Sequence, residues 1–182
     1  MNPARARALV FIGVLGVLAT GTALGVGLAQ GRLGAGERLR VASCTPANLP
    51  GAIVNVTLSD RGGAMMGAGN GMMVALVASP ATVSSRTVTF VATNVGALDH
   101  EFLVLPAPRD GIGTRPVGAN GKIDESTSLG EASTSCGPGA GPGISPGASS
   151  WVTLHLTPGN YELLCDVPWH YANGMFAAFR VR

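Results

Sequence analysis

The stretch from Cys165 to Met175, CDVPWHYANGM, constrains this chain more than any other part of its sequence. It offers a thiol, an imidazole and a thioether at the spacing C-x4-H-x4-M. Copper prefers such soft and borderline donors, whereas hard cations prefer oxygen. A trigonal copper site with a weak axial methionine needs two histidines, so one more imidazole must come from elsewhere. Among the 3 histidines of the chain, His100 is the candidate because it heads the apolar run HEFLVL.

The spacing agrees with the way in which strands alternate their side chains. Residues two apart on a strand face the same side, so Cys165 shares an inward face with Leu163, and Met175 shares one with Phe179. The residues between them, DVPWHYANG, contain Pro, Asn and Gly and are typical of a turn that folds its histidine back. Three strand ends therefore converge. The predicted ligands of a mononuclear copper site are His100, Cys165, His170 and Met175.

Other chemistries fit these residues less well. A Cys/His nucleophile pair usually needs a third residue to orient the base, and none is evident. Structural zinc favours four cysteine or histidine ligands, and methionine is a poor zinc ligand. Multicopper oxidases need many more than 3 histidines, and a binuclear copper site needs a second cysteine in the loop. In a metal-free β-sandwich, the spacing of Cys165, His170 and Met175 would be a coincidence.

Together with the segments NVGALDHEFLVL and LTPGNYELLC, the loop resembles the cupredoxins, and most closely the sulfocyanins, which are membrane-attached blue-copper electron carriers. The resemblance extends from about Leu49 to Arg182. It implies an all-β fold, a cupredoxin-like Greek-key β-sandwich, around one type 1 copper ion. It also implies that Cys165 and the two histidines form the trigonal plane, with His170 on the solvent side. The chain departs from the family at Trp169, where glycine is expected.

The N-terminal part of the chain predicts a transmembrane helix. After the basic stretch MNPARAR, residues 8–29 carry no charge and are numerous enough to span a bilayer. A cleaved signal peptide ending before Gln30 is the alternative. Arginines on both sides of the span mildly oppose an outside C-terminus, but a blue-copper domain belongs in an oxidising compartment. We therefore expect a single-pass protein of the cell membrane with its copper domain on the extracytoplasmic side.

Composition suggests how the rest of the chain is organised. The predicted units are an anchor or signal peptide, a Gly-rich tether and the copper domain, at 1–30, 31–48 and 49–182. The predicted strands include 53–58, 72–80, 86–94 and 151–156. A long insertion loop is expected at 106–150, with at most a helical turn within 122–132 and no regular structure in 137–150. His155 should face solvent.

Charge and cysteine content narrow the function further. The formal net charge is +2, and it comes from the two arginines before the anchor, so the remainder is neutral. With a single lysine and no basic cluster, nucleic-acid binding is not expected. Copper would take Cys165, which leaves Cys44 and Cys136. We expect these two to form a disulfide in an extracytoplasmic protein, and two unpaired thiols are the alternative.

The sequence thus predicts a membrane-tethered blue copper protein that carries single electrons between redox partner proteins of a respiratory chain. No enzymatic activity and no small-molecule substrate are expected. The alternative is an extracytoplasmic copper-binding protein for copper delivery or buffering. Four methionines between Met65 and Met73 are the only support for this alternative, and a loop plus a strand end with apolar filler is the favoured interpretation of them.

Overall fold

The computed structural model describes residues 44, 46, 48–61 and 73–182. The predicted anchor and most of the tether lie outside these residues. Within the described residues, no helix is long and apolar enough to cross a membrane. Every element described here belongs to one compact unit, Arg38–Arg182.

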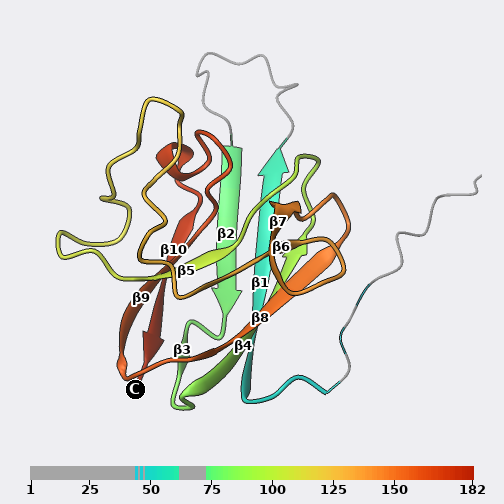
Figure 1. Ribbon diagram of the computed structural model, residues 1–182, viewed down its shortest axis with the longest axis vertical. Coiled ribbons are helices and arrows are strands. Elements are labelled where there is room, and N and C mark those ends of the chain that lie inside the picture. Colours follow the sequence, from blue (N-terminus) through green and yellow to red (C-terminus); the bar gives the residue numbers. More distant parts are fainter. Residues whose placement is uncertain (1–43, 45, 47, 62–72) are drawn as a thin grey trace, which may run out of the picture. The chain divides into compact units, whose positions relative to one another are not determined.

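Two β-sheets make up the described part of Arg38–Arg182 (Figure 1). The four-stranded sheet has the order β2-β1-β4-β8, with β1 at Ala52–Arg61, β2 at Met73–Ser79, β4 at Thr87–Asn94 and β8 at Ser149–His155. The six-stranded sheet has the order β3-β10-β9-β5-β6-β7, with β3 at Thr82–Val83, β5 at Leu103–Pro106, β6 at Gly130–Thr134, β7 at Gly139–Gly143, β9 at Gly159–Leu164 and β10 at Phe176–Val181. A short 3-10 helix, Tyr171–Asn173, precedes β10. The all-β sandwich predicted from the sequence is confirmed.

The core between the sheets follows the alternation of the sequence. On β1, exposed and buried residues alternate from Ile53 to Leu58, and the buried ones join residues of both sheets in one apolar cluster. At its centre, the ring of Phe90 lies 5.4 Å from that of Phe102 and 5.0 Å from that of Phe179. Such aromatic pairs add about 0.5–1.5 kcal/mol each beyond the burial of their area.

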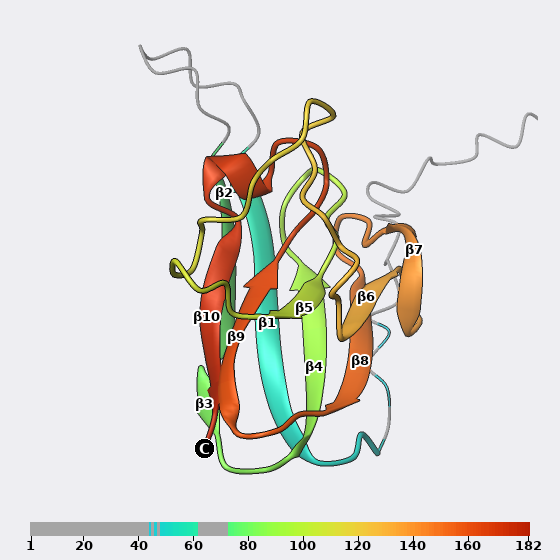
Figure 2. The same ribbon diagram turned by 60° about the vertical axis from the view of Figure 1, so that its left-hand side comes forward.

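Part of the outer face of the six-stranded sheet is also buried, which the alternation did not predict. Leu103, Leu105 and Leu164 belong to a second apolar cluster that also contains Ile123 and Tyr171. Ile123 comes from the long segment after β5, which crosses β9 and β10 in the view of Figure 2. Part of the insertion is therefore a cover for the outer face of this sheet.

The other part of the insertion pairs as strands. The prediction that 137–150 holds no regular structure is wrong, because β7 lies within it and pairs with β6. Residues 122–132 hold no helical turn, only a turn closed by the bond from the Ser128 amide to the Glu125 carbonyl and the start of β6. At Gly141, a Cβ atom would lie 2.6 Å from the carbonyl oxygen of Ser133. Gly141 thus allows a close pairing of β7 with β6 that a larger residue would prevent.

The predicted disulfide between Cys44 and Cys136 is confirmed. It joins residues 92 positions apart and attaches the start of the domain to the β6–β7 turn. A loop of this length corresponds to about 4–5 kcal/mol of stabilisation in the chain-entropy treatment, which is an upper value.

Candidate metal centre

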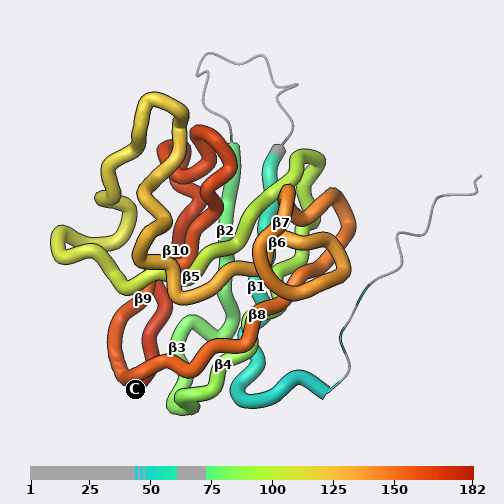
Figure 3. Tube along the Cα trace, viewed as in Figure 1, coloured from blue at the N-terminus to red at the C-terminus, as the bar shows by residue number. Residues whose placement is uncertain are grey.

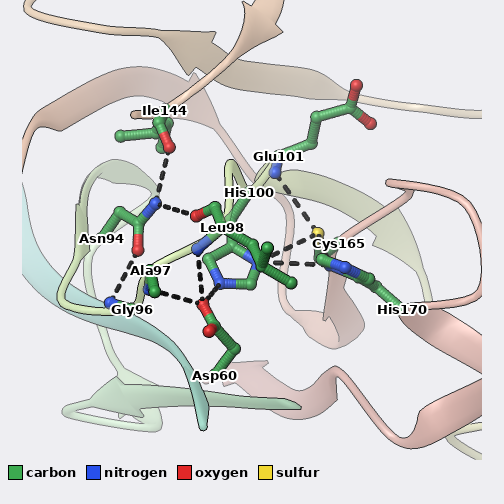
Figure 4. Close-up of polar contacts among 10 residues, drawn as sticks. All are labelled: Asp60, Asn94, Gly96, Ala97, Leu98, His100, Glu101, Ile144, Cys165 and His170. Atoms are coloured by element: carbon green, nitrogen blue, oxygen red, sulfur yellow. Dashed lines mark hydrogen bonds and ion pairs between the residues drawn. The ribbon is translucent and has the colours of Figure 1, made fainter. Parts of the chain in front are cut away.

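The structure brings three of the four predicted ligands to one point (Figure 4). The Sγ atom of Cys165 lies 3.4 Å from Nδ1 of His170 and 3.9 Å from Nδ1 of His100. The two Nδ1 atoms are 3.2 Å apart. The exposed fraction of each residue is 2% or less, so the three donors converge in the protein interior.

The loop after β4 places His100. Asn94 ends that strand, and its Nδ2 donates to the carbonyl oxygens of Leu98 at 2.7 Å and Ile144 at 2.6 Å. Its Oδ1 accepts from the amide of Gly96 at 2.8 Å. His100 exchanges two backbone hydrogen bonds with Ile144, at 3.2 and 2.7 Å. Hydrogen bonds from Asn94 to the preceding loop and between Ile144 and His100 itself therefore fix the main chain at this predicted ligand.

The connection between β9 and β10 places the other predicted ligands. The amide of Cys165 donates to the carbonyl of Met175 at 3.1 Å, and the amide of Met175 donates to the carbonyl of His170 at 3.1 Å. The Cys165 sulfur accepts from the amide of Glu101 at 3.3 Å. The Met175 side chain is fully buried in the apolar cluster that contains Cys165. Main-chain bonds thus hold these ligands in one rigid turn.

Burial sets the protonation of the three donors. It raises the pKa of the Cys165 thiol to about 12, so a thiolate here needs a cation beside it. Burial, together with the neighbouring imidazole, lowers the pKa of His170 to about 4. Burial also lowers the pKa of His100, although the Asp60 carboxylate opposes it. Both imidazoles are therefore neutral at neutral pH, the form that binds metals.

This donor set fits one type 1 copper ion. Bonds of about 2.0 Å to nitrogen and about 2.3 Å to sulfur, as zinc makes, give separations of about 3.3–3.7 Å between donors. The observed separations of 3.2, 3.4 and 3.9 Å are close to these values. One thiolate, two imidazoles and a thioether are the donors of a blue-copper site.

Asp60 on β1 is a residue of the site that we did not predict. Its Oδ1 accepts from Nε2 of His100 at 2.9 Å and from the amides of Ala97 at 2.9 Å and Leu98 at 3.0 Å. Burial raises its pKa, but these hydrogen bonds outweigh burial and lower it. The sequence did contain a signal: Asp60 has the parity of Leu58, so this carboxylate had to face the core.

Trp169, the departure from the family pattern, has a left-handed backbone with φ of 71°. Glycine is favoured in this region because it has no Cβ to clash, which gives a physical reason for the expected glycine. The Trp169 amide donates to the carbonyl of Gly121 at 2.8 Å, so the insertion supports this turn. Trp169 is 52% exposed and His170 2%. The indole, rather than the imidazole, therefore meets solvent.

A buried ion pair joins the insertion to the ligand turn. Glu162 is fully buried on the outer face of β9. Its Oε1 accepts from the hydroxyl of Tyr171 at 3.0 Å and the amide of Gly113 at 2.6 Å, while its Oε2 accepts from Nε of Arg115 at 2.5 Å. The Arg115 amide donates to the Tyr171 oxygen at 3.0 Å. Because Tyr171 directly follows His170, the insertion holds the ligand turn through a side chain as well.

Three carboxylates near the ligands surround Lys122, the only lysine of the chain. Its Nζ lies 3.6 Å from Glu101, 3.7 Å from Glu125 and 3.7 Å from Asp166. Burial raises the pKa of Glu101 and of Asp166. Burial lowers the pKa of Lys122, but the carboxylates outweigh it and raise that pKa. The ammonium group fills this acidic cluster, which is therefore not an open cation site.

The remaining predicted features lie elsewhere. His155 on β8 is exposed, as predicted, and its Nδ1 lies 3.2 Å from Oγ1 of Thr87. In the methionine-rich stretch, only Met73 falls within the described residues, with an exposed fraction of 64%. The other three methionines lie outside the described part of the chain, so the hypothesis that this stretch handles copper stays a prediction.

No family model and no curated protein matches the chain, but solved structures do. Reduced auracyanin from Roseiflexus castenholzii is 20% identical, with a TM-score of 0.40, over 58% of this chain and 87% of that one. Auracyanin A from Chloroflexus aurantiacus, a blue copper protein, is 18% identical, with a TM-score of 0.43, over 72% and 100%. Rusticyanin from Thiobacillus ferrooxidans is 20% identical, with a TM-score of 0.39, over 71% and 77%.

The fold meets the expectation drawn from the sequence. Two sheets enclose one apolar core. A loop before β5 and the β9–β10 connection bring a thiol and two imidazoles together at its edge. The chain is therefore a cupredoxin-like β-sandwich with the donor set of one type 1 copper ion.

Proposed function

We propose that this protein is an electron carrier that moves single electrons through its copper site. The observation that supports the proposal is the buried convergence of Cys165 Sγ with the Nδ1 atoms of His100 and His170. Copper bound there would supply a one-electron couple between Cu(I) and Cu(II). The contribution of the protein is to hold the donors nearly fixed, so that electron transfer requires little rearrangement.

The contacts around the ligands support this rigidity. His100 is held by two backbone bonds to Ile144 and by the Asp60 carboxylate. The β9–β10 connection is held by its own main-chain bonds. Met175 is the expected axial ligand, since its thioether is a soft, weak donor. It would stabilise Cu(II) less than a harder oxygen ligand would, and so keep the reduction potential above that of a site with an oxygen ligand.

We also propose that the copper domain is tethered to the cell membrane on the extracytoplasmic side and exchanges electrons with respiratory proteins. The uncharged stretch 8–29 supports the tether. The disulfide between Cys44 and Cys136 supports an oxidising compartment. The resemblance to the sulfocyanins supports the respiratory partners.

The test uses the full-length protein purified in detergent, with its copper removed and then restored. One equivalent of Cu(II) should give an intense visible charge-transfer band and a narrow copper hyperfine splitting. Voltammetry should then show a reversible one-electron wave. Absence of the band would contradict the proposal. So would ready loss of Cu(I) from the reduced protein to a competing chelator, which is the behaviour of a copper-delivery protein.

A further inference from the structure

Asp60 places a carboxylate against the edge of the His100 ring that points away from the other donors. The two side chains are fully buried, and Nε2 of His100 donates to Oδ1 of Asp60 at 2.9 Å. A proton on Nε2 leaves the lone pair of the neutral ring on Nδ1. In Figure 4 this Nδ1 atom points towards Cys165 and His170. The contact therefore selects the tautomer that can bind a metal at the site.

The surroundings of this carboxylate are built for a negative charge. The backbone passes so close to Oδ1 at Gly96 that any side chain there would overlap it. The amides of Ala97 and Leu98 both donate to the same oxygen. The other oxygen, Oδ2, is buried without a hydrogen-bond partner among the described residues. Burial of a carboxylate is costly unless donors or a cation compensate it, and a metal on the opposite edge of His100 would supply that cation.

We propose that Asp60 is a positioning residue that fixes the Nδ1 donor of His100 and biases the copper site towards its oxidised form. The inference rests on the proposed electron-carrier function. With the Cys165 thiolate and the Asp60 carboxylate, the site is neutral around Cu(II) and carries one negative charge around Cu(I). A buried negative charge stabilises the more positive state, so Asp60 lowers the reduction potential.

The substitution Asp60→Asn separates this role from a purely structural one. Asparagine keeps the shape and one acceptor oxygen for the His100 ring and the loop amides, but it removes the charge. Asp99→Asn is the matched control, because Asp99 directly precedes His100, carries the same charge and is exposed. Water screens that exposed charge, so the control should shift the potential little.

The measurements use the full-length protein in detergent. We expect Asp60→Asn to keep the visible band, to raise the reduction potential and to weaken Cu(II) binding by about 10–100-fold. Cu(I) binding should weaken less, and each tenfold selective loss of Cu(II) affinity corresponds to a rise of about 59 mV for one electron. A folded Asp60→Asn protein whose potential is no higher than that of Asp99→Asn would overturn the proposal.

A second measurement needs no variant. Nitrogen NMR of the copper-free wild-type protein should show His100 protonated at Nε2, and a proton on Nδ1 instead would also overturn the proposal. If the wild-type protein binds copper without an intense visible band, the electron-carrier function is refuted instead. The NMR result then still decides whether Asp60 sets the tautomer of His100.

Discussion

His100 and His170 present the same atom, Nδ1, to the same point, but the protein holds them in different ways. The imidazole of His100 is fixed by a side chain, the buried carboxylate of Asp60. The position of His170 is fixed by its turn: its amide donates to the carbonyl of Val167 at 2.9 Å, and its carbonyl accepts from the amide of Met175. One ligand has a charged partner, whereas the other depends on the fold of a loop.

Because of this difference, the surroundings of His100 and the His170 turn should respond differently to substitution. A charge near a ligand acts on the relative energies of the oxidised and reduced states, whereas the packing of a loop acts on the free energy of unfolding. Substitutions on the His100 side should therefore mainly shift the reduction potential. Substitutions beneath the His170 turn should mainly change stability and leave the potential close to that of the wild type.

Cys165 is close to both histidines, since its sulfur lies 3.9 Å from Nδ1 of His100 and 3.4 Å from Nδ1 of His170. Cys165→Ser should abolish the visible band completely, because the thiolate is the source of the charge transfer. The domain should stay folded, since serine differs little in volume. Absorption and circular dichroism spectra with added Cu(II) test both statements. A variant that keeps the intense band would show that Cys165 is not the ligand.

Glu162→Gln tests the support of the His170 turn. The new amide group would set a donor against Arg115 or Tyr171 in a buried place, and we expect a loss of about 2–3 kcal/mol in the free energy of unfolding. The potential should change little. Denaturant unfolding of the copper-free protein measures the loss. Glu131→Gln, at a half-buried position on β6, is the control and should cost no more than about 0.5 kcal/mol. Equal losses in the two variants would contradict the role of the network.

Met175 sharpens the comparison because its backbone belongs to the His170 turn, while its thioether is the expected axial ligand. Met175→Leu removes a donor at similar volume, a change that costs less than about 1.5 kcal/mol in most cores. The protein should stay blue and its potential should rise. Met175→Gln supplies a harder oxygen donor and should lower the potential. Voltammetry of both variants is the test, and shifts in the same direction would argue against axial ligation by Met175.

The smallest effect is expected at Trp169. Glycine removes the strain of the left-handed backbone at φ 71°, whereas alanine removes the same indole but keeps a Cβ. Trp169→Gly should therefore be more stable than Trp169→Ala by about 1 kcal/mol. Thermal unfolding of the two copper-free variants measures this difference. If alanine proves the more stable, the backbone of this turn relaxes in the variant.

The parts of the site that follow strand alternation could be predicted from the sequence. Cys165, Met175 and His100 are separated along the chain, but each stands at a strand end whose inward residues reveal its direction. Asp60 could have been predicted by the same rule, because it continues the inward series of β1. Its contact with His100 could not have been predicted, because alternation gives the face on which a residue lies and not the neighbour that it contacts across the sandwich.

The cover over the outer face could not be predicted. Glu162 and Leu164 lie on the side of β9 that alternation assigns to solvent, and they are buried because a segment without a periodic pattern lies over them. Segments rich in Gly and Pro carry little local preference, so tertiary contacts such as the Arg115–Glu162 pair decide their path. Figure 3 traces this path from the end of β5 to the ligand turn and back to β6.

Lys122 has a practical consequence for measurements on electrodes. Apart from the N-terminal amino group, it is the only primary amine of the chain. A reagent that couples proteins to a surface through lysine would neutralise the ammonium group that lies between Glu101, Glu125 and Asp166. It would leave three carboxylates without their counter-charge close to the predicted copper ligands. It would also bring the electrode surface against the segment that supports these residues. A potential measured after such coupling would describe a modified protein, so attachment through the N-terminus or adsorption without chemical coupling is the sounder design.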